Sequence, residues 1–298
     1  MGFRQRVGCG TVSWLRQSYA VKRVAIPREN LQLVRPASGC GTAVLVLAGS
    51  SGAVDLDRAQ LLAEHGALAV AMRWFGGPGQ HCGPWEIPLE DFTEALELVA
   101  PEVDRLAILG SSFGAEAALC VAACDHRVEA VVAIAPSAYV WPGVDGSGRP
   151  TSHWTRRGVP LAFVPLDETW LAATDPPAFR GWYETSVVTH ATALEAAAIP
   201  VESIRGTVVV VAGGDDQVWP ADTSARAIER RRRRSGATTT VVVHPGAGHR
   251  IVFPGERPVS RGQTMRRGGN PAADAALGAR AWPHVVSAFR LHTKPTTP

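Results

Sequence analysis

The feature that most constrains this chain is a short apolar run leading into the sequence Gly-Ser-Ser-Phe-Gly. Residues 106–109 (LAIL) are typical of a strand buried in a parallel sheet, and the alanine-rich segment after Gly114 predicts a helix. The pattern G-x-S-x-G between a strand and a helix is typical of a nucleophile elbow. We therefore expect Ser112 to lie in a tight, strained turn above the sheet. Gly110 and Gly114 would let the strand and helix backbones approach each other.

An elbow at this position would also supply hydrogen-bond donors. The backbone N–H of Phe113 and the start of the helix would face the point where an oxyanion develops. The alternative is an ordinary strand–helix turn in which Ser112 caps the helix. Glycine and serine are common in loops, so the pattern alone does not separate the two interpretations. An acidic residue and a histidine in the right order would favour the elbow.

Candidate acids and bases follow two later apolar runs. Asp215 and Asp216 come shortly after the run TVVVVA, and His244 and His249 come after the run TTTVVV. The carboxyl ends of parallel strands share one edge of a sheet, where α/β proteins place their chemistry. The order Ser, Asp, His is that of the α/β-hydrolases. The sequence therefore favours the elbow at Ser112.

Two neighbouring aspartates compete for the acidic position. The spacing G-x-x-D-x-x-x-P from Gly213 to Pro220 favours Asp216 over Asp215. Either could instead cap the helix predicted over residues 221–231.

The histidine that follows a small-residue loop is the preferred base. His249 comes after Gly-Ala-Gly, which can swing an imidazole back over the sheet, whereas His244 stands at the strand end and is interpreted as structural. A serine hydroxyl needs a neutral imidazole to take its proton, and that imidazole needs an acceptor on its far nitrogen. We expect Ser112, Asp216 and His249 to form the catalytic triad.

The arginine run 230–234 has two interpretations. It could clamp the phosphates of coenzyme A. The favoured alternative is the exposed end of a helix, where cations suit the helix dipole.

Alternating strand-like and helix-like segments predict an α/β fold with a mostly parallel central sheet flanked by helices. The strand-like runs are residues 43–48, 67–72, 106–109, 128–134, 207–212 and 238–243, and the helix-like segments are 57–65, 89–99, 115–124, 221–231 and 272–291. Residues 24–26 and 31–34 predict an antiparallel pair at a sheet edge.

The expected domain organisation is an N-terminal extension over residues 1–20 and a single α/β-hydrolase domain over residues 21–298. Prolines and aromatic residues interrupt the alternation over residues 136–204, which predicts a cap-like insertion over a pocket. We expect these aromatic side chains to pack rather than to contact substrate.

Composition excludes several classes of partner. A net charge of +3 argues against nucleic acid or an anionic membrane surface, and no apolar stretch approaches the roughly 18 residues of a membrane span. The first residues lack the apolar region of a secretory signal. Five scattered cysteines without a C-x-x-C indicate free thiols rather than disulfides or a metal site, so we expect a cytoplasmic protein that needs no cofactor.

From about Gly39 to its end, the chain resembles the C-terminal catalytic domain shared by acyl-CoA thioesterases and the bile-acid-CoA:amino-acid N-acyltransferase. The matching stretches are GSSGAVDLDRAQLLAEHGALAVA, LAILGSSFGAEAAL, IPVESIRGTVVVVAGGDDQVW, HPGAGH and, more loosely, the final helix. The resemblance implies the same triad. It also implies an oxyanion hole made by the backbone N–H groups of Phe113 and Ser50.

The sequence departs from that family in two respects. About 40 residues precede the first buried strand, which is fewer than the β-sandwich domain of animal members needs. The amino-acid transferases it resembles use cysteine at the elbow, whereas position 112 is serine. An acyl-serine is readily attacked by water, so serine favours hydrolysis over transfer. The alanine, arginine and glycine content suits a bacterium with GC-rich DNA, where the acyl chain could be tethered to a carrier protein.

The sequence therefore predicts a serine hydrolase that cleaves a small-molecule acyl thioester, either acyl-CoA or carrier-tethered, through an acyl-serine. The alternatives are an acyltransferase or cyclase that passes the acyl group to an amine or hydroxyl, a carboxylesterase, and a binding protein with an idle triad. The acyl chain, the leaving group and the oligomeric state stay open.

Overall fold

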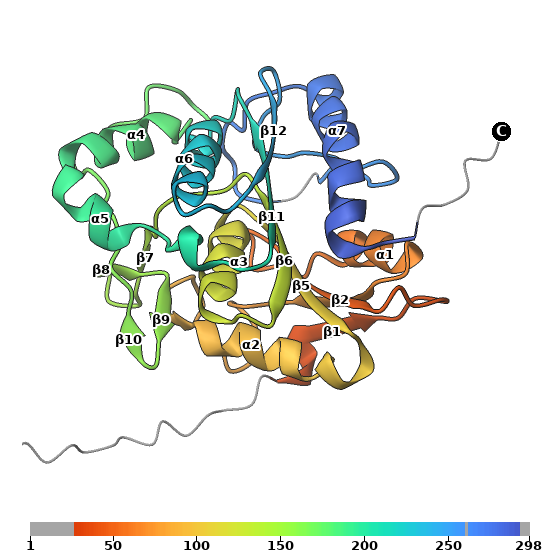
Figure 1. The fold of residues 1–298 in the computed structure, drawn as a ribbon. Coiled ribbons are helices and arrows are strands. Elements are labelled where there is room, and N and C mark those ends of the chain that lie inside the picture. Colours follow the sequence, from red (N-terminus) through yellow and green to blue (C-terminus); the bar gives the residue numbers. More distant parts are fainter. Residues whose placement is uncertain (1–26, 260–261, 293–298) are drawn as a thin grey trace, which may run out of the picture.

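The computed structural model describes residues 27–259 and 262–292. Its centre is a seven-stranded sheet in the order β1-β3-β2-β5-β6-β11-β12 (Figure 1). Every neighbouring pair is parallel except β1–β3. The strands are β1 (Leu31–Val34), β2 (Thr42–Leu47), β3 (Leu68–Met72), β5 (Arg105–Ser111), β6 (Val128–Ile134), β11 (Thr207–Gly213) and β12 (Thr240–His244). The predicted mostly parallel sheet is confirmed.

The first strand of the described chain lies at the edge of the sheet and is antiparallel to its neighbour. β1 pairs with β3, with Leu31 opposite Met72. Residues 31–34 thus lie at an antiparallel sheet edge, as predicted, and the predicted pairing with residues 24–26 stays a prediction. A short 3-10 turn, η1 (Arg28–Asn30), precedes β1 and directs it onto the free edge of β3. Residues 24–26, like the expected extension over residues 1–20, lie outside the described residues.

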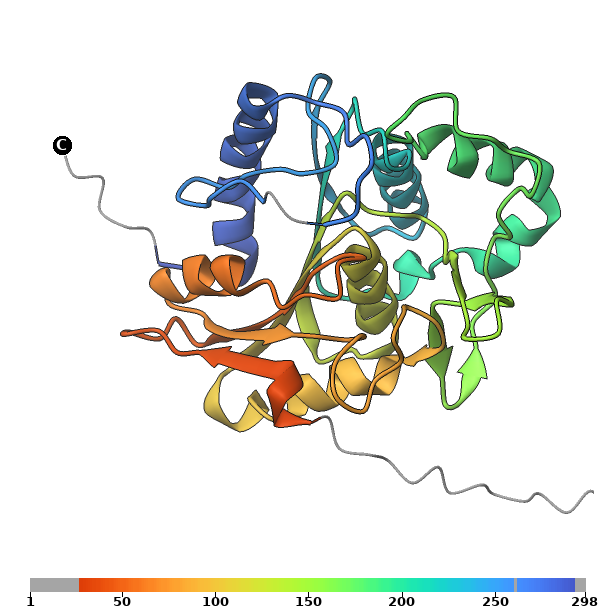
Figure 2. The same ribbon diagram turned by 180° about the vertical axis from the view of Figure 1, so that it is seen from behind.

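Helices cover both faces of the sheet, as Figures 1 and 2 show. Successive strand residues point to opposite faces, so Val44 and Val46 pack in one hydrophobic cluster while Leu45 and Leu47 pack in the other. The first face is covered by α1 (Leu56–Glu64) and α7 (Pro271–Phe289), and the second by α2 (Leu89–Glu97), α3 (Phe113–Cys124) and α6 (Ala221–Arg234).

Buried side chains fix the position of α7 and the length of α6. In α7 four apolar residues spaced four positions apart are fully buried, namely Leu277, Ala281, Val285 and Phe289. α6 continues to Arg234, three residues beyond the prediction, because the buried Arg232 binds main-chain carbonyls and holds the last turn in place.

The segment between β6 and β11 forms a separate layer, at the left of Figure 1. It contains short strands and helices with irregular connections, consistent with its many prolines. They are β7 (Pro142–Val144), β8 (Pro150–Ser152), β9 (Trp154–Arg156), β10 (Val159–Pro160), α4 (Arg180–Thr189), η3 (Ala191–Ala193), α5 (Leu194–Ala197) and η4 (Val201–Ser203). β9 also pairs with β4 (Ile87–Pro88), which ties this segment to the loop before α2.

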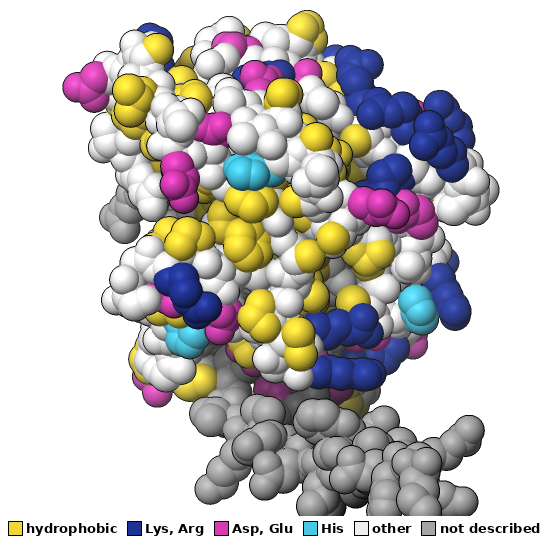
Figure 3. All heavy atoms as spheres, turned by 90° about the vertical axis from the view of Figure 1, so that its left-hand side faces the viewer, with side chains coloured by type: hydrophobic (Ala, Val, Ile, Leu, Met, Phe, Trp, Pro, Cys, Tyr) yellow, Lys and Arg dark blue, Asp and Glu magenta, His cyan; other side chains and the backbone are white. Residues whose placement is uncertain are grey.

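Figure 3 shows the molecule from that side. Hydrophobic side chains gather in a hollow across the middle of this face, and Lys and Arg side chains gather at its upper right. The parallel strands β5, β11 and β12 end at the same edge of the sheet, so the loops that follow them are brought together.

Candidate active site

Ser112 stands in a strained turn between β5 and α3. Its backbone angles are φ 58° and ψ −124°, in a region that side-chain-bearing residues rarely adopt. Its N–H donates to Ile134 O of the neighbouring strand at 2.9 Å, and its carbonyl accepts from Ala115 N at 2.8 Å and Glu116 N at 3.1 Å. These bonds join the turn to the sheet on one side and to the first turn of α3 on the other.

Glycines make this turn possible. A Cβ on Gly110 would overlap the carbonyl group of Gly114, and a Cβ on Gly114 would overlap the Ala48 carbonyl at the end of β2. A Cβ on Gly49 would lie 2.9 Å from Ser112 Cβ, so the loop after β2 passes directly beside the serine. Ser50, the expected oxyanion-hole residue, is the next residue in that loop.

Asp216 and His249 are brought together from the loops after β11 and β12. His249 Nδ1 lies 2.7 Å from Asp216 Oδ2. Asp216 is fully buried, and its other oxygen accepts from Val218 N at 2.8 Å and Trp219 N at 3.3 Å. Both carboxyl oxygens therefore have fixed partners, and one of them binds the imidazole through Nδ1.

The competing residues have other contacts. Asp215 accepts hydrogen bonds from the Gln217 side chain at 2.7 Å and from Gly269 N at 2.8 Å, which joins the acid loop to the segment before α7. His244 Nδ1 accepts from Gly246 N at 3.2 Å and so stabilises the loop before His249. α6 begins after Pro220 without a side-chain cap, so neither aspartate caps that helix.

An aromatic side chain connects the serine and histidine loops. Trp219 contacts the Phe113 ring at 5.3 Å and the His249 ring at 6.1 Å between centroids. Its indole N–H donates to Ala135 O at 3.1 Å, which holds it at the end of β6. The structure contains no hydrogen bond from the Ser112 hydroxyl to another described residue. Asp216 and His249 are thus in direct contact, and Trp219 bridges the histidine to the residue after the serine.

Comparison with known proteins assigns the chain to a family. The family model described as "BAAT / Acyl-CoA thioester hydrolase C terminal" matches residues 87–295. The chain belongs to this family. The resemblance identified from the sequence is confirmed.

The curated relatives of this family member include an N-acyltransferase and a thioesterase. The chain is 26% identical over 316 residues to acyl-coenzyme A amino acid N-acyltransferase 2 of Mus musculus, covering 95% of this chain and 72% of the relative. It is 26% identical over 292 residues to acyl-coenzyme A thioesterase 6 of Mus musculus, covering 91% of this chain and 65% of the relative.

Among solved structures, a dienelactone hydrolase candidate from Klebsiella pneumoniae has a similar fold. The TM-score is 0.51 at 17% identity, over 87% of this chain and 92% of that one. This similarity confirms the predicted α/β-hydrolase fold of the family member.

Some residues of the site were not expected from the sequence. Asp274, in the first turn of α7, accepts from Gly248 N at 2.7 Å and so holds the residue before the histidine. Burial raises the pKa of Asp274, and the charges of Asp215 and Asp216 add to the effect. The available signal was an acidic residue four positions after the helix-capping Asn270.

A buried arginine supports the strand end beneath the elbow. Arg58 donates to Ser111 Oγ at 2.8 Å and pairs with Glu256 at 2.6 Å. Burial alone would lower its pKa, but the charges of Glu256 and Asp55 raise it instead. The segment after His249 is thereby joined to the residue before Ser112.

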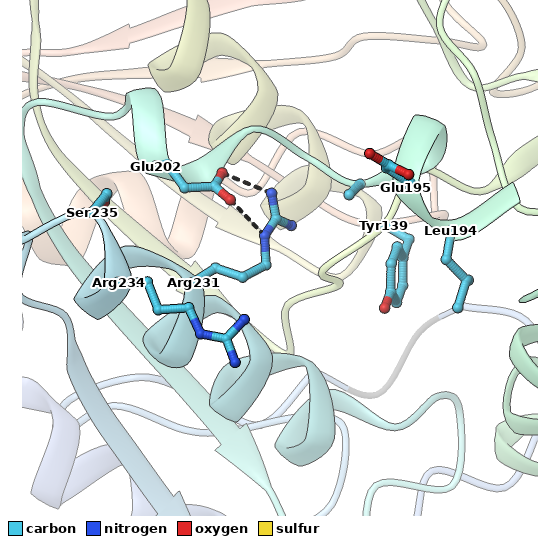
Figure 4. A pocket seen from close by; sticks show the side chains of 8 residues that line it. Tyr139, Leu194, Glu195, Glu202, Arg231, Arg234 and Ser235 are labelled. Carbon is cyan, nitrogen blue, oxygen red and sulfur yellow. Dashed lines mark hydrogen bonds and ion pairs between the residues drawn. The ribbon is translucent and has the colours of Figure 1, made fainter. Parts of the chain in front are cut away.

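The arginine run does not face the triad. Arg232 is buried and donates to Val201 O and Ile204 O, so the interpretation of the run as an exposed helix end is wrong for this residue. Arg231 pairs with Glu202 at 2.7 Å beside a cavity of about 580 Å³, and Figure 4 shows Arg234 on the same side of that cavity. The cavity is lined by Tyr139, Leu194, Glu195, Ala198, Glu202, Arg231, Arg234 and Ser235, none of which belongs to the triad loops. Phosphate binding by this run stays the less favoured interpretation.

The aromatic residues of the insertion mostly pack together. Trp141 and Trp154 are buried in the main core, and Trp170 stacks on Trp182 with ring centroids 5.5 Å apart. Tyr183 contacts both Trp141 and Trp219, so this packing extends to the triad loops.

The described residues contain neither a metal site nor a membrane-spanning helix. No group of three or more His, Cys, Asp or Glu side chains is placed to hold a metal ion there. Within the same residues, no helix has the length and hydropathy needed to cross a bilayer. The four cysteines in the described ranges are unpaired, and Cys9 lies outside them.

Proposed function

We propose that this protein is a serine hydrolase that cleaves an acyl thioester through a covalent acyl-Ser112 intermediate. The substrate class is an acyl-CoA or an acyl chain on a carrier-bound thiol. Family membership supports an enzyme that acts on thioester or ester bonds. The single observation that carries the mechanism is the 2.7 Å contact between His249 Nδ1 and the buried Asp216.

This contact supports an assignment of donor and acceptor roles to the two imidazole nitrogens. With Nδ1–H donated to Asp216, Nε2 carries the lone pair and can accept a proton. In the proposed first step, Ser112 Oγ forms a bond to the thioester carbon while its proton passes to His249 Nε2. The carbonyl π electrons move to oxygen, and Asp216 stabilises the imidazolium that forms.

The developing oxyanion needs donors on the side of the α3 N-terminus. Phe113 N–H lies in the first turn of α3, and the Gly49–Ser50 loop passes beside the serine. We assign the oxyanion hole to the N–H groups of Phe113 and Ser50.

Collapse of the tetrahedral intermediate completes acylation. The C–S bond breaks, and the thiolate takes the proton from His249. Water then attacks the acyl-serine with His249 again accepting a proton, and release of the free acid restores Ser112.

The test is intact-protein mass spectrometry after brief exposure to acyl-CoA, acyl-pantetheine and plain ester substrates. We expect an acyl adduct on the wild type and none on Ser112→Ala. Ser111→Ala is the matched control, because its hydroxyl is bound to Arg58 and should not acylate. Normal turnover by Ser112→Ala would contradict the proposal, and adducts formed only from plain esters would favour a carboxylesterase.

A second candidate function is acyl transfer to an amine or hydroxyl. The observation in its favour is the similarity to a relative named as an amino acid N-acyltransferase. It predicts an amide or ester product, at the expense of free acid, when candidate acceptors are added. The idle-triad alternative predicts that Ser112 will not react with a fluorophosphonate probe.

A further inference from the structure

A buried glutamate lies one helical turn after the serine. Glu116 belongs to the first turn of α3, and its N–H donates to the Ser112 carbonyl at 3.1 Å. The residue has no solvent exposure. Its main chain is therefore part of the elbow, while its side chain extends from α3 toward the insertion.

One carboxyl oxygen of Glu116 binds three groups from the insertion. Oε1 accepts from Trp154 Nε1 at 2.8 Å and from Trp141 N at 3.1 Å, and it lies 3.3 Å from His153 Nδ1. The three partners come from β9 and the residues that flank β7 and β8. A single oxygen thus joins an irregular, proline-rich segment to the elbow helix.

The His153 ring connects the Glu116 contact to the elbow. His153 is 1% exposed, and its ring lies 4.2 Å from the Phe113 ring between centroids. Phe113 is also in contact with Trp219. The Phe113 ring is consequently held between His153 from the insertion and Trp219 from the acid loop.

This arrangement carries a cost in stability. Glu116 Oε2 is buried and has no hydrogen-bond partner among the described residues. Burying a carboxyl oxygen without a partner is unfavourable, and such groups in folded proteins often have a functional reason. After the larger effect of burial, the charge of Glu116 also raises the pKa of both Cys120 and Tyr183.

We propose that Glu116 is a positioning residue for the attack by Ser112. By holding His153 against Phe113, it fixes the peptide that carries the oxyanion-hole N–H, and it keeps the insertion seated on the elbow. This inference rests on the proposed function. It adds a role for the insertion, namely to fix the geometry of the reacting groups.

The first test compares two substitutions at the same position. Glu116→Leu removes all three contacts at similar volume, whereas Glu116→Gln keeps an oxygen acceptor toward the insertion. We expect Glu116→Leu to lower the rate constant for fluorophosphonate labelling of Ser112 at least tenfold per folded molecule. Glu116→Gln should stay within about threefold of the wild type and unfold at an equal or higher temperature, because a neutral amide costs less to bury without a partner than a carboxylate does.

A second pair tests the route through His153. His153→Phe keeps a ring against Phe113 but loses the contact with Glu116, so it should label more slowly than the wild type, whereas His153→Ala loses both contacts and should label more slowly still. Equal rates for these two variants would contradict a role for the ring contact.

Arg232→Met is the matched control. Arg232 is also buried and bound to main-chain carbonyls, but it holds η4 rather than the elbow. We expect this variant to lose stability without slower labelling per folded molecule. If Glu116→Leu behaves like Arg232→Met, the role of Glu116 is structural and the inference is wrong. If the wild type itself does not react with the probe, the proposed function fails instead.

Discussion

Replacing Asp216 by asparagine is predicted to inactivate the enzyme without disturbing its fold. Oδ1 of Asp216 accepts two main-chain N–H groups, from Val218 and Trp219, so the amide oxygen of the asparagine must occupy that position. The NH₂ group then faces His249 Nδ1, where the carboxylate oxygen had been. Nδ1 becomes the acceptor, and the proton of the neutral imidazole moves to Nε2. A protonated Nε2 cannot take the proton of Ser112.

The magnitude follows from this exchange of tautomers. The equivalent change in a serine protease triad lowers kcat by about 10⁴, which is about 5 kcal/mol of activation free energy. We expect a loss of that order in thioester hydrolysis by Asp216→Asn. KM should change little, because Asp216 is buried behind the histidine and does not face substrate.

The assay measures thiol release from an acyl-CoA by a thiol-reactive chromophore, together with fluorophosphonate labelling. Asp215→Asn is the control. Asp215 binds Gln217 and Gly269 rather than His249, so this variant should keep activity within a few-fold of the wild type. Asp216→Asn activity within tenfold of the wild type, or an equal loss in Asp215→Asn, would refute the assignment of the acid.

Three further predictions concern the elbow and the histidine loop. Both Ser112→Ala and Ser112→Gly should lose turnover by several orders of magnitude. The glycine variant should have a free energy of unfolding about 1 kcal/mol higher than the alanine variant in chemical denaturation, because only alanine keeps the strain of a positive φ. Equal stabilities would contradict the strained turn. Gly110→Ala should cost about 3 kcal/mol or more, since its Cβ overlaps the Gly114 carbonyl, and a normal unfolding midpoint would show that the turn can relax. Asp274→Asn keeps an acceptor for Gly248 N and removes a carboxyl whose pKa is raised in the folded state. A carboxyl whose pKa is raised by folding favours the folded state only at pH values where it is protonated, so the wild type loses stability as pH rises. This variant should therefore have a higher melting temperature than the wild type at pH 7, and the difference should shrink below about pH 4. A gain independent of pH would point to another cause.

The elbow and the sheet could be predicted because their signals are local. A buried parallel strand, a G-x-S-x-G turn and a small-residue helix are adjacent in sequence, and each carries its own steric requirement. The acid was chosen by its spacing from Pro220, and the observed contact with His249 agrees with that choice.

Contacts made across irregular segments could not be predicted in the same way. Glu116 and His153 are 37 residues apart and meet through short strands whose order has no periodic signature. The partner of β1 depends on a free sheet edge rather than on neighbouring residues.

A missed periodicity explains the error over the arginine run. Ala225, Ile228 and Arg232 follow one another at helical spacing on the buried face of α6, so the pattern already placed Arg232 inside. The buried position of Arg232 was missed because a run of arginines is normally interpreted by its charge rather than by the position of each residue on the helix.

The backbone at the elbow is shaped by crowded main-chain atoms and not by the serine side chain. Gly49, Gly110 and Gly114 fix the turn whatever atom the residue at position 112 bears on its Cβ. A sulfur could take the place of the oxygen there without any rearrangement of the scaffold. In evolutionary terms, the nucleophilic atom at position 112 could change while the surrounding turn stays the same.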